Sequence, residues 1–152
     1  LEVGALQRNI TWKVAIDHIT NQGKYGNTIN LDWDRPKKLG LSDLSPQRRH
    51  YQKESILVCL QHDKSEQVSG IHSMEYWLQD TPAVQSLIQG CPVIVDETSL
   101  AYPCSNKYSN LDNPAIDLYT RNKWYVEMAH TEYTVDEIRD GRWYERLKWA
   151  IE

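Results

Sequence analysis

Apolar and polar positions alternate in two short stretches near the start of the chain. The first is residues 10–16 and the second is residues 28–33, with a connection rich in Gly and Asn between them. A period of two is typical of half-buried strands, and Gly and Asn suit tight turns. The sequence therefore predicts an N-terminal β-hairpin over residues 10–33, ended by Pro36 because proline cannot donate to a strand ladder.

Continuous apolar runs and helical spacing alternate through the middle of the chain. Residues 56–60 and 93–95 are continuous apolar runs, as expected of strands covered on both faces. Helical signals lie at residues 45–54, 73–78 and 81–89, and the last of these begins with Thr-Pro and stops before a glycine. The order strand, helix, strand predicts one βαβ unit with parallel strands.

The last third of the chain combines a long loop with a C-terminal helix. Residues 97–114 are rich in Ser, Asn, Pro and Tyr and predict a loop, while residues 123–130 fit either a strand or a short helix. Thr134 and Glu137 have the spacing of a capping box, which opens a helix that continues to the end of the chain. Gly141 weakens that helix by about 1 kcal/mol relative to Ala.

These patterns predict an α/β (or α+β) fold with a mixed β-sheet, an N-terminal hairpin, one βαβ unit and a C-terminal helix. The length of 152 residues fits a single globular domain spanning 1–152. With 40% hydrophobic and 25% charged residues the composition is that of a soluble protein, and no apolar run is long enough to span a membrane. The chain begins with Leu, which suggests a fragment or a processed chain.

The net charge of −4 argues against a surface that is basic all over, but it allows a local basic patch. Such a patch would contact the phosphates of a nucleic acid, and the alternative is an ordinary solvated face. The candidate residues are Arg35, Lys37, Lys38, Arg48 and Arg49.

The aromatic residues are biased toward rings that carry a polar group. The chain has 6 Trp and 9 Tyr but no Phe. This bias fits a surface that stacks on bases, sugars or another protein, and equally a core whose N–H and O–H groups are all bonded. The three cysteines have no paired spacing, so we expect no disulfide framework and an intracellular, reducing compartment.

Three short apolar runs, residues 14–16, 56–60 and 93–95, are each followed by a carboxylate or a histidine. The side chains at these ends are Asp17, His18, His62, Asp63, Asp96 and Glu97. If the runs are neighbouring strands, their ends meet at one edge of the sheet, where such folds place ligands. We expect Asp17, Asp63 and Asp96 to bind Mg²⁺ or Mn²⁺, with Glu97 as the alternative to Asp63. His18 or His62 is the expected general base.

The segment Val14-Ala15-Ile16-Asp17-His18, with its glycine-bearing turn and returning strand, resembles the opening hairpin of ribonuclease H-like nucleases. The resemblance covers residues 10–33 and implies that Asp17 binds a divalent cation that takes part in phosphodiester cleavage. The family's third consecutive strand is not evident between Pro36 and Ser55. A role for Asp17 as a turn former only is the alternative.

The same region also resembles the first half of an HNH nuclease motif, through Asp17-His18-Ile19, Gly23, Gly26 and Asn30. In that family a His acts as general base and neighbouring residues hold one metal ion. The final His or Asn of the motif is absent, because residues 37–40 occupy its place.

The sequence thus favours a metal-dependent nuclease or phosphodiesterase that acts on nucleic acid. The alternative is a non-catalytic module of a larger, viral or other, assembly that binds protein or nucleic acid through a surface rich in Trp and Tyr. A protein partner or a homo-oligomer is compatible with either function, and no membrane association is expected.

Overall fold

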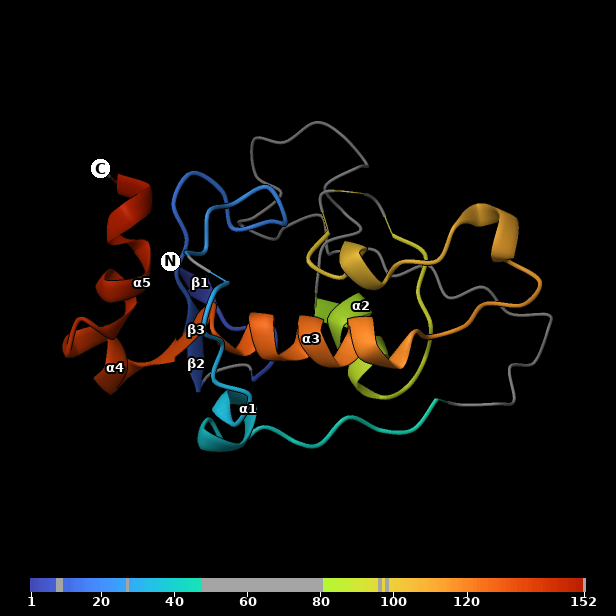
Figure 1. The fold of residues 1–152 in the computed structure, drawn as a ribbon, viewed down its shortest axis with the longest axis horizontal. Coiled ribbons are helices and arrows are strands. Elements are labelled where there is room, and N and C mark those ends of the chain that lie inside the picture. Colours follow the sequence, from blue (N-terminus) through green and yellow to red (C-terminus); the bar gives the residue numbers. More distant parts are fainter. Residues whose placement is uncertain (8–9, 27, 48–80, 96, 98, 152) are drawn as a thin grey trace, which may run out of the picture.

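The computed structural model describes residues 1–7, 10–26, 28–47, 81–95, 97 and 99–151. It combines helices with a small antiparallel sheet, which confirms a mixed fold of helices and strands (Figure 1). The elements in chain order are β1 (Glu2–Val3), β2 (Thr11–Lys13), α1 (Arg35–Lys38), α2 (Thr81–Ile88), the 3-10 helices η2 (Tyr102–Cys104) and η3 (Tyr108–Asn110), α3 (Leu118–Ala129), β3 (Glu132–Thr134), α4 (Val135–Arg139) and α5 (Arg142–Ile151). In the part of the chain that is described, no helix has the length and apolar character of a membrane span.

The sheet joins the two ends of the chain. Its strand order is β1-β2-β3 and both pairings are antiparallel. Trp12 lies opposite Val3 on one side and Tyr133 on the other, and Lys13 lies opposite Glu132. Because β3 is followed directly by α4, this pairing anchors the C-terminal helices to the N-terminal segment.

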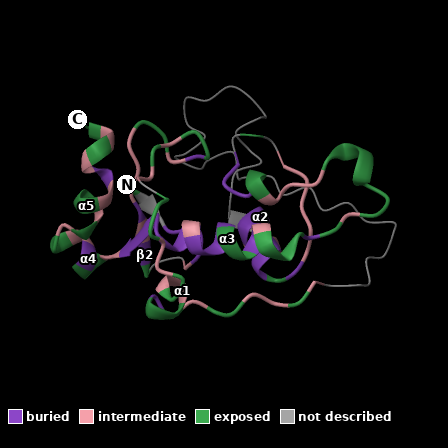
Figure 2. Cartoon of the chain, in the orientation of Figure 1, coloured by how far each residue is buried: buried purple, intermediate pink, exposed green. Residues whose placement is uncertain are grey.

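Helix α3 is the centre of the core: its C-terminal end leads to β3, and residues of α2 belong to the same hydrophobic cluster (Figure 1). Its residues Trp124, Tyr125, Met128 and Ala129 recur at the three- and four-residue spacing of one helix face, and all four are buried (Figure 2). The indole N–H of Trp124 donates to the Leu100 carbonyl at 2.8 Å. These two aromatic residues of α3 therefore belong to the core.

The predicted N-terminal hairpin is wrong in its second strand. Residues 28–33 form no strand, and both edges of β2 are already occupied by β1 and β3. Within the predicted hairpin the structure has one isolated antiparallel bridge, in which Ile16 and Lys24 exchange two backbone hydrogen bonds of 3.0 Å. Alternation indicated a strand correctly at β2, but it carries no information on which strand is its partner.

The predicted strand at residues 92–95 is also wrong. This segment pairs with a loop instead of a strand: Val95 N–H donates to Ser105 Oγ at 2.9 Å and Asn106 N–H donates to the Val93 carbonyl at 2.8 Å. The helix predicted at 81–89 is confirmed as α2. Residues 45–47 are not helical; the rest of that helix, the strand at 56–60 and the helix at 73–78 lie outside the described residues.

The capping box before the C-terminal helix is confirmed. Thr134 Oγ1 accepts from Glu137 N–H at 3.2 Å, and the Glu137 carboxylate accepts from Thr134 N–H at 3.0 Å. One continuous helix was expected after it, but Gly141 has a φ of +74° and separates α4 from α5. A left-handed residue ends an α-helix, and glycine adopts that conformation without steric cost. The loop predicted over residues 97–114 contains the two short 3-10 helices, and residues 123–130 belong to α3 except for His130.

Candidate functional site

The predicted metal site is described only at Asp17, His18 and Glu97. Asp17 has a φ of +72° and is the middle residue of a tight turn closed by His18 N–H donating to the Ile16 carbonyl at 3.0 Å. Its carboxylate is exposed and lies 2.8 Å from Lys24 Nζ. The hydrogen bond and the charge of Lys24 lower the pKa of Asp17.

The turn at Asp17 and the backbone of Glu97 are connected through Asn21, whose side chain donates to the Glu97 carbonyl at 3.1 Å. Three of the predicted site residues, His62, Asp63 and Asp96, lie outside the described residues. Within the described ranges, no group of three or more His, Cys, Asp or Glu side chains has the arrangement of a metal site. Binding of Mg²⁺ or Mn²⁺ therefore stays a prediction.

Arg35, expected to contact phosphates, turns inward in the structure. Its guanidinium donates to both carboxylate oxygens of Glu137, to the Glu132 carbonyl at 2.8 Å and to the Ala129 carbonyl at 3.2 Å. The guanidinium also lies 5.6 Å from the ring centroid of Tyr133. Only 14% of the Arg35 side chain is exposed, and its hydrogen bonds connect α1 to β3 and to α4.

The neighbouring lysines remain available at the surface. Lys37 and Lys38 are exposed, and Lys38 Nζ pairs with Asp32 at 2.5 Å. Trp33 lies just before α1 with 55% of its surface exposed. Arg48 and Arg49 lie outside the described residues.

Several other aromatic side chains are also exposed, in contrast to the buried Trp124 and Tyr125. Among them is Trp149 on α5, which is 71% exposed and whose ring centroid lies 5.4 Å from Lys148 Nζ. The exposed rings in the described part are Trp33, Tyr102, Tyr108, Tyr119, Tyr144 and Trp149. Lys148 lies beside the ring of Trp149, and Trp33 immediately precedes the segment that carries the exposed Lys37 and Lys38.

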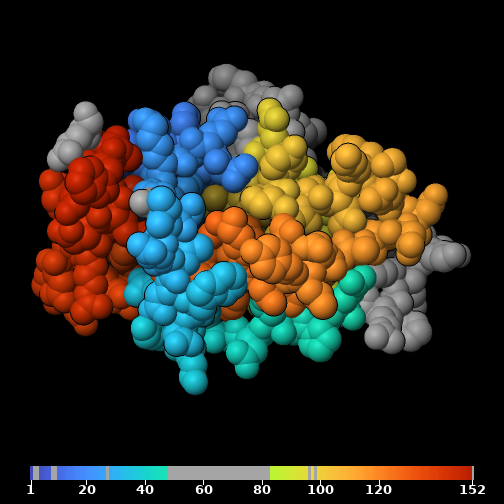
Figure 3. All heavy atoms as spheres, viewed as in Figure 1, coloured from blue at the N-terminus to red at the C-terminus, as the bar shows by residue number. Residues whose placement is uncertain are grey.

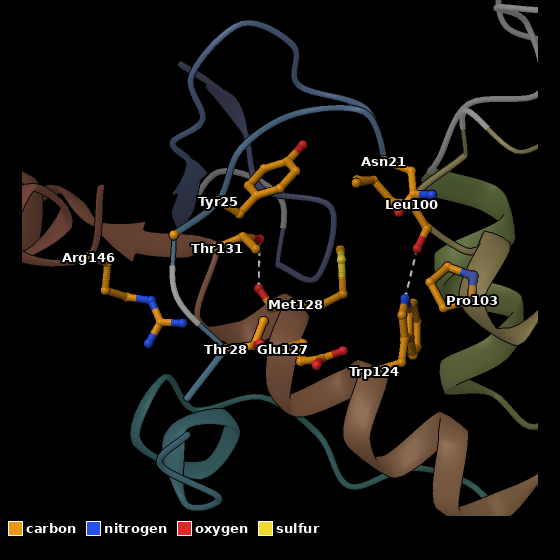
Figure 4. A pocket seen from close by; sticks show the side chains of 11 residues that line it. Asn21, Tyr25, Thr28, Leu100, Pro103, Trp124, Glu127, Met128, Thr131 and Arg146 are labelled. Carbon is orange, nitrogen blue, oxygen red and sulfur yellow. Dashed lines mark hydrogen bonds between the residues drawn. The ribbon is translucent and has the colours of Figure 1, made fainter. Parts of the chain in front are cut away.

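A hollow lies where the loop 21–28 faces α3 and α5 (Figure 4). It has a volume of about 190 Å³. Leu100, Trp124 and Met128 give it apolar walls, and Glu127 and Arg146 bring charge to it from α3 and α5. Its lining residues are Asn21, Tyr25, Gly26, Thr28, Leu100, Pro103, Trp124, Glu127, Met128, Thr131 and Arg146.

A second hollow of about 390 Å³ adjoins the first and shares Tyr25, Gly26 and Arg146 with it. It adds Lys24 and Trp149, so an exposed ring and two basic side chains meet there. Gly26 lets the loop approach α5 closely: a Cβ there would lie 2.6 Å from the Arg146 carbonyl, and the φ of Gly26 is +93°. Any other residue at this position would clash with α5 and strain the backbone.

The charge around these hollows is opposite in sign to that of the whole chain. Residues 21–40 carry four basic and two acidic side chains, and residues 142–151 carry three basic and one acidic, whereas the chain has a net charge of −4. Burial, and then the positive charge of Arg35, lower the pKa of Arg146. Helix α4, which precedes α5, carries the acidic residues Asp136 and Glu137, and Glu137 forms an ion pair with Arg35.

His130 was not among the residues singled out from the sequence, yet it fixes the backbone just before α1. Its Nε2 accepts from Asp32 N–H at 3.1 Å, and its Nδ1 donates to the Val126 carbonyl at 2.8 Å. This arrangement requires the neutral ring, because Nε2 must keep a lone pair. Burial, above all, lowers the pKa of His130, and the nearby charges of Arg146 and Arg35 act in the same direction.

We expect the protein to lose stability as pH falls through and below the ordinary histidine pKa of 6.5. The folded-state pKa is lower than the unfolded one, so the unfolded state takes up the proton first and the folded state is penalised. Thermal melts between pH 8 and pH 5 check this. His130→Gln should flatten the pH dependence above pH 5, and an unchanged slope in that variant would contradict the assignment.

The Arg35–Glu137 ion pair and the exposure of individual tryptophans could not be predicted from a single sequence. Arg35 and Glu137 are 102 positions apart, and an exposed Trp has the same sequence letter as a buried one. The Thr-x-x-Glu capping box did indicate Glu137, but only as a helix cap. Comparisons of the chain with protein-family models, with curated proteins and with solved structures found no match.

Proposed function

We propose that the protein is a non-catalytic module that binds single-stranded nucleic acid. The observation that carries the proposal is the exposure of Trp33 and Trp149, the first just before the lysine-bearing helix α1 and the second beside Lys148 on α5. We define the basic aromatic surface as Trp33, Lys37, Lys38, Arg142, Lys148 and Trp149, with the adjoining groove at Lys24 and Arg146.

The parts of this surface are held together by specific contacts. Gly26 packs against the backbone of Arg146, and Arg35 is bonded to Glu137 at the beginning of α4. Figure 3 shows the segment around residues 24–38 running alongside the C-terminal helices. A flexible strand lying along this segment would therefore meet rings and cations in turn.

The chemistry favours a single strand over a duplex. Every base has a π-face that can stack on an indole ring, but in a duplex those faces are already stacked on each other. Lysine and arginine side chains beside the rings contact the phosphates between successive bases. A local positive charge on an acidic chain favours such an anionic ligand over an average protein surface.

Binding of a labelled 20-nucleotide single strand, followed by fluorescence anisotropy, tests the proposal. Stacking contributes roughly 1–3 kcal/mol per base, so Trp33→Ala and Trp149→Ala should each weaken binding by about 5- to 150-fold. Tyr108→Ala is the matched control, because Tyr108 is 80% exposed on η3, far from α5 in Figure 1. Equal binding by all three variants, or no binding by the wild type, would contradict the proposal.

The same assay distinguishes this proposal from the metal-dependent nuclease. A non-catalytic module leaves the strand intact when Mg²⁺ or Mn²⁺ is added, and its affinity falls with salt as phosphate contacts are screened. Cleavage that requires the metal and disappears in Asp17→Asn would instead support the nuclease.

A further inference from the structure

The smaller hollow has the dimensions of a site for one ring system. Its volume of about 190 Å³ is below the range of pockets that hold drug-sized ligands. The walls at Leu100, Trp124 and Met128 are apolar, and Tyr25 lies across from α3 (Figure 4). A flat ring, with its faces against the apolar walls and its edge toward the polar side chains, therefore fits this hollow better than a long flexible group.

Two charged side chains of opposite sign reach this hollow from different helices. Glu127 belongs to α3 and its carboxylate is partly buried, with Lys123 Nζ at 3.4 Å from one oxygen. Arg146 belongs to α5 and lines both hollows. In Figure 4, Arg146 reaches in from one side while Trp124, Glu127 and Met128 lie along α3 on the other.

A carboxylate at the edge of a site for a flat base selects among the bases by the hydrogen-bond donors on their edges. Guanine alone has a ring N–H and an amino group side by side on its pairing edge, so one carboxylate can accept from both. Adenine and cytosine place a ring nitrogen acceptor beside their amino group, and uracil and thymine have carbonyls on both sides of the ring N–H. These acceptors would face the negative charge of Glu127 without a hydrogen bond.

We propose that this hollow holds one guanine base of the bound strand, with Glu127 accepting its two N–H donors and Arg146 contacting the neighbouring phosphate. Arginine suits the second role because its fork of N–H donors matches phosphate oxygens. The inference rests on the proposed binding of single-stranded nucleic acid and adds a base preference to it. The exposed rings of Trp33 and Trp149 stack on bases of any type, whereas this hollow selects one.

Calorimetric titration of the wild-type protein with GMP, AMP, CMP and UMP tests the inference. A good bidentate contact discriminates by about 1–3 kcal/mol, so GMP should bind about 5- to 150-fold more tightly than the other three. Glu127→Gln should reduce this preference to less than about threefold. Glu145→Gln is the matched control, since Glu145 is an exposed acid on α5 that does not line the hollow.

A second variant tests the location without changing the charge. Thr28 is exposed and lines the hollow, so Thr28→Trp should fill part of it and abolish GMP binding while strand binding through Trp33 persists. Unchanged GMP affinity in Thr28→Trp, or equal affinity for the four nucleotides, would overturn the inference. Strand binding without any GMP binding would overturn the inference alone, whereas absence of strand binding would count against the proposed function.

Discussion

Replacing Arg35 with Ala should lower the free energy of unfolding by about 3–5 kcal/mol, the cost of breaking a buried ion pair from one side. Arg35 donates to the Glu137 carboxylate and to the carbonyls of Ala129 and Glu132, so the variant removes one donor from three partners at once. Urea denaturation followed by circular dichroism measures the change. A side chain that served only to contact phosphates would not produce it.

Lys37→Ala is the matched control for Arg35→Ala. Lys37 belongs to the same short helix but is exposed, so its replacement should change stability by less than about 0.5 kcal/mol. For binding of single-stranded nucleic acid, Lys37→Ala should have the larger effect of the two variants, because it removes a phosphate contact and leaves the fold intact. Equal unfolding midpoints for the two variants would contradict the structural role of Arg35.

Replacing Glu132 with Ala should have an effect of similar size, about 3–5 kcal/mol. Glu132 is fully buried, and its carboxylate accepts from Leu6 N–H at 2.8 Å and from Thr11 Oγ1 at 2.5 Å. Lys13 lies opposite it in the sheet and is only 1% exposed, so the variant also removes a negative charge from the neighbourhood of a buried ammonium group. Gly4 packs directly on this carboxylate and on Thr11.

Hydrogen exchange measures the effect of Glu132→Ala at its source. The amide of Leu6 should lose protection first, because its acceptor is removed, and the pairing of β1 with β2 should weaken with it. The exposed Glu145→Ala should leave both exchange and melting temperature nearly unchanged. Retained protection at Leu6 would show that the carboxylate does not hold this corner of the sheet.

The elements that could be predicted from the sequence are those with local signals. Thr134 and Glu137 form the predicted capping box because both partners lie within one turn of helix. Helix α2 follows its apolar spacing, with Val84 and Leu87 buried. The sequence predicts only a weakened helix at Gly141, whereas in the structure the helix ends there. A glycine can do either, and its backbone conformation decides between the two.

The pairings that could not be predicted are the long-range ones. β2 pairs with β1 and β3, and no property of residues 28–33 showed that these two strands would already occupy both of its edges. Glu132 and Lys13 look like surface residues in the sequence, yet their mutual position in the sheet allows both to be buried. Such burial depends on contacts more than 100 positions apart in the chain.

The sequence predicted which residue types could form a site, but not which of them are exposed. The absence of Phe and the excess of Trp and Tyr predict either an exposed aromatic surface or a core, and the structure has rings of both kinds, with Trp124 buried and Trp149 exposed. The strand-end acids gave a metal-site hypothesis that the described residues do not test, because His62, Asp63 and Asp96 lie outside them. Arg35 was predicted to contact phosphates, but its guanidinium is mostly buried and bonded to Glu137.

Photochemical cross-linking tests the central claim most directly. A single strand carrying 4-thiouridine at several positions is bound to the wild-type protein and irradiated, and the cross-linked peptides are identified by mass spectrometry. The basic aromatic surface predicts cross-links to the peptides that contain Trp33 and Trp149, and their loss when the rings are replaced by Ala. Cross-links confined to residues 99–118, with none at residues 24–38 or on α5, would contradict the proposal that this surface binds the strand.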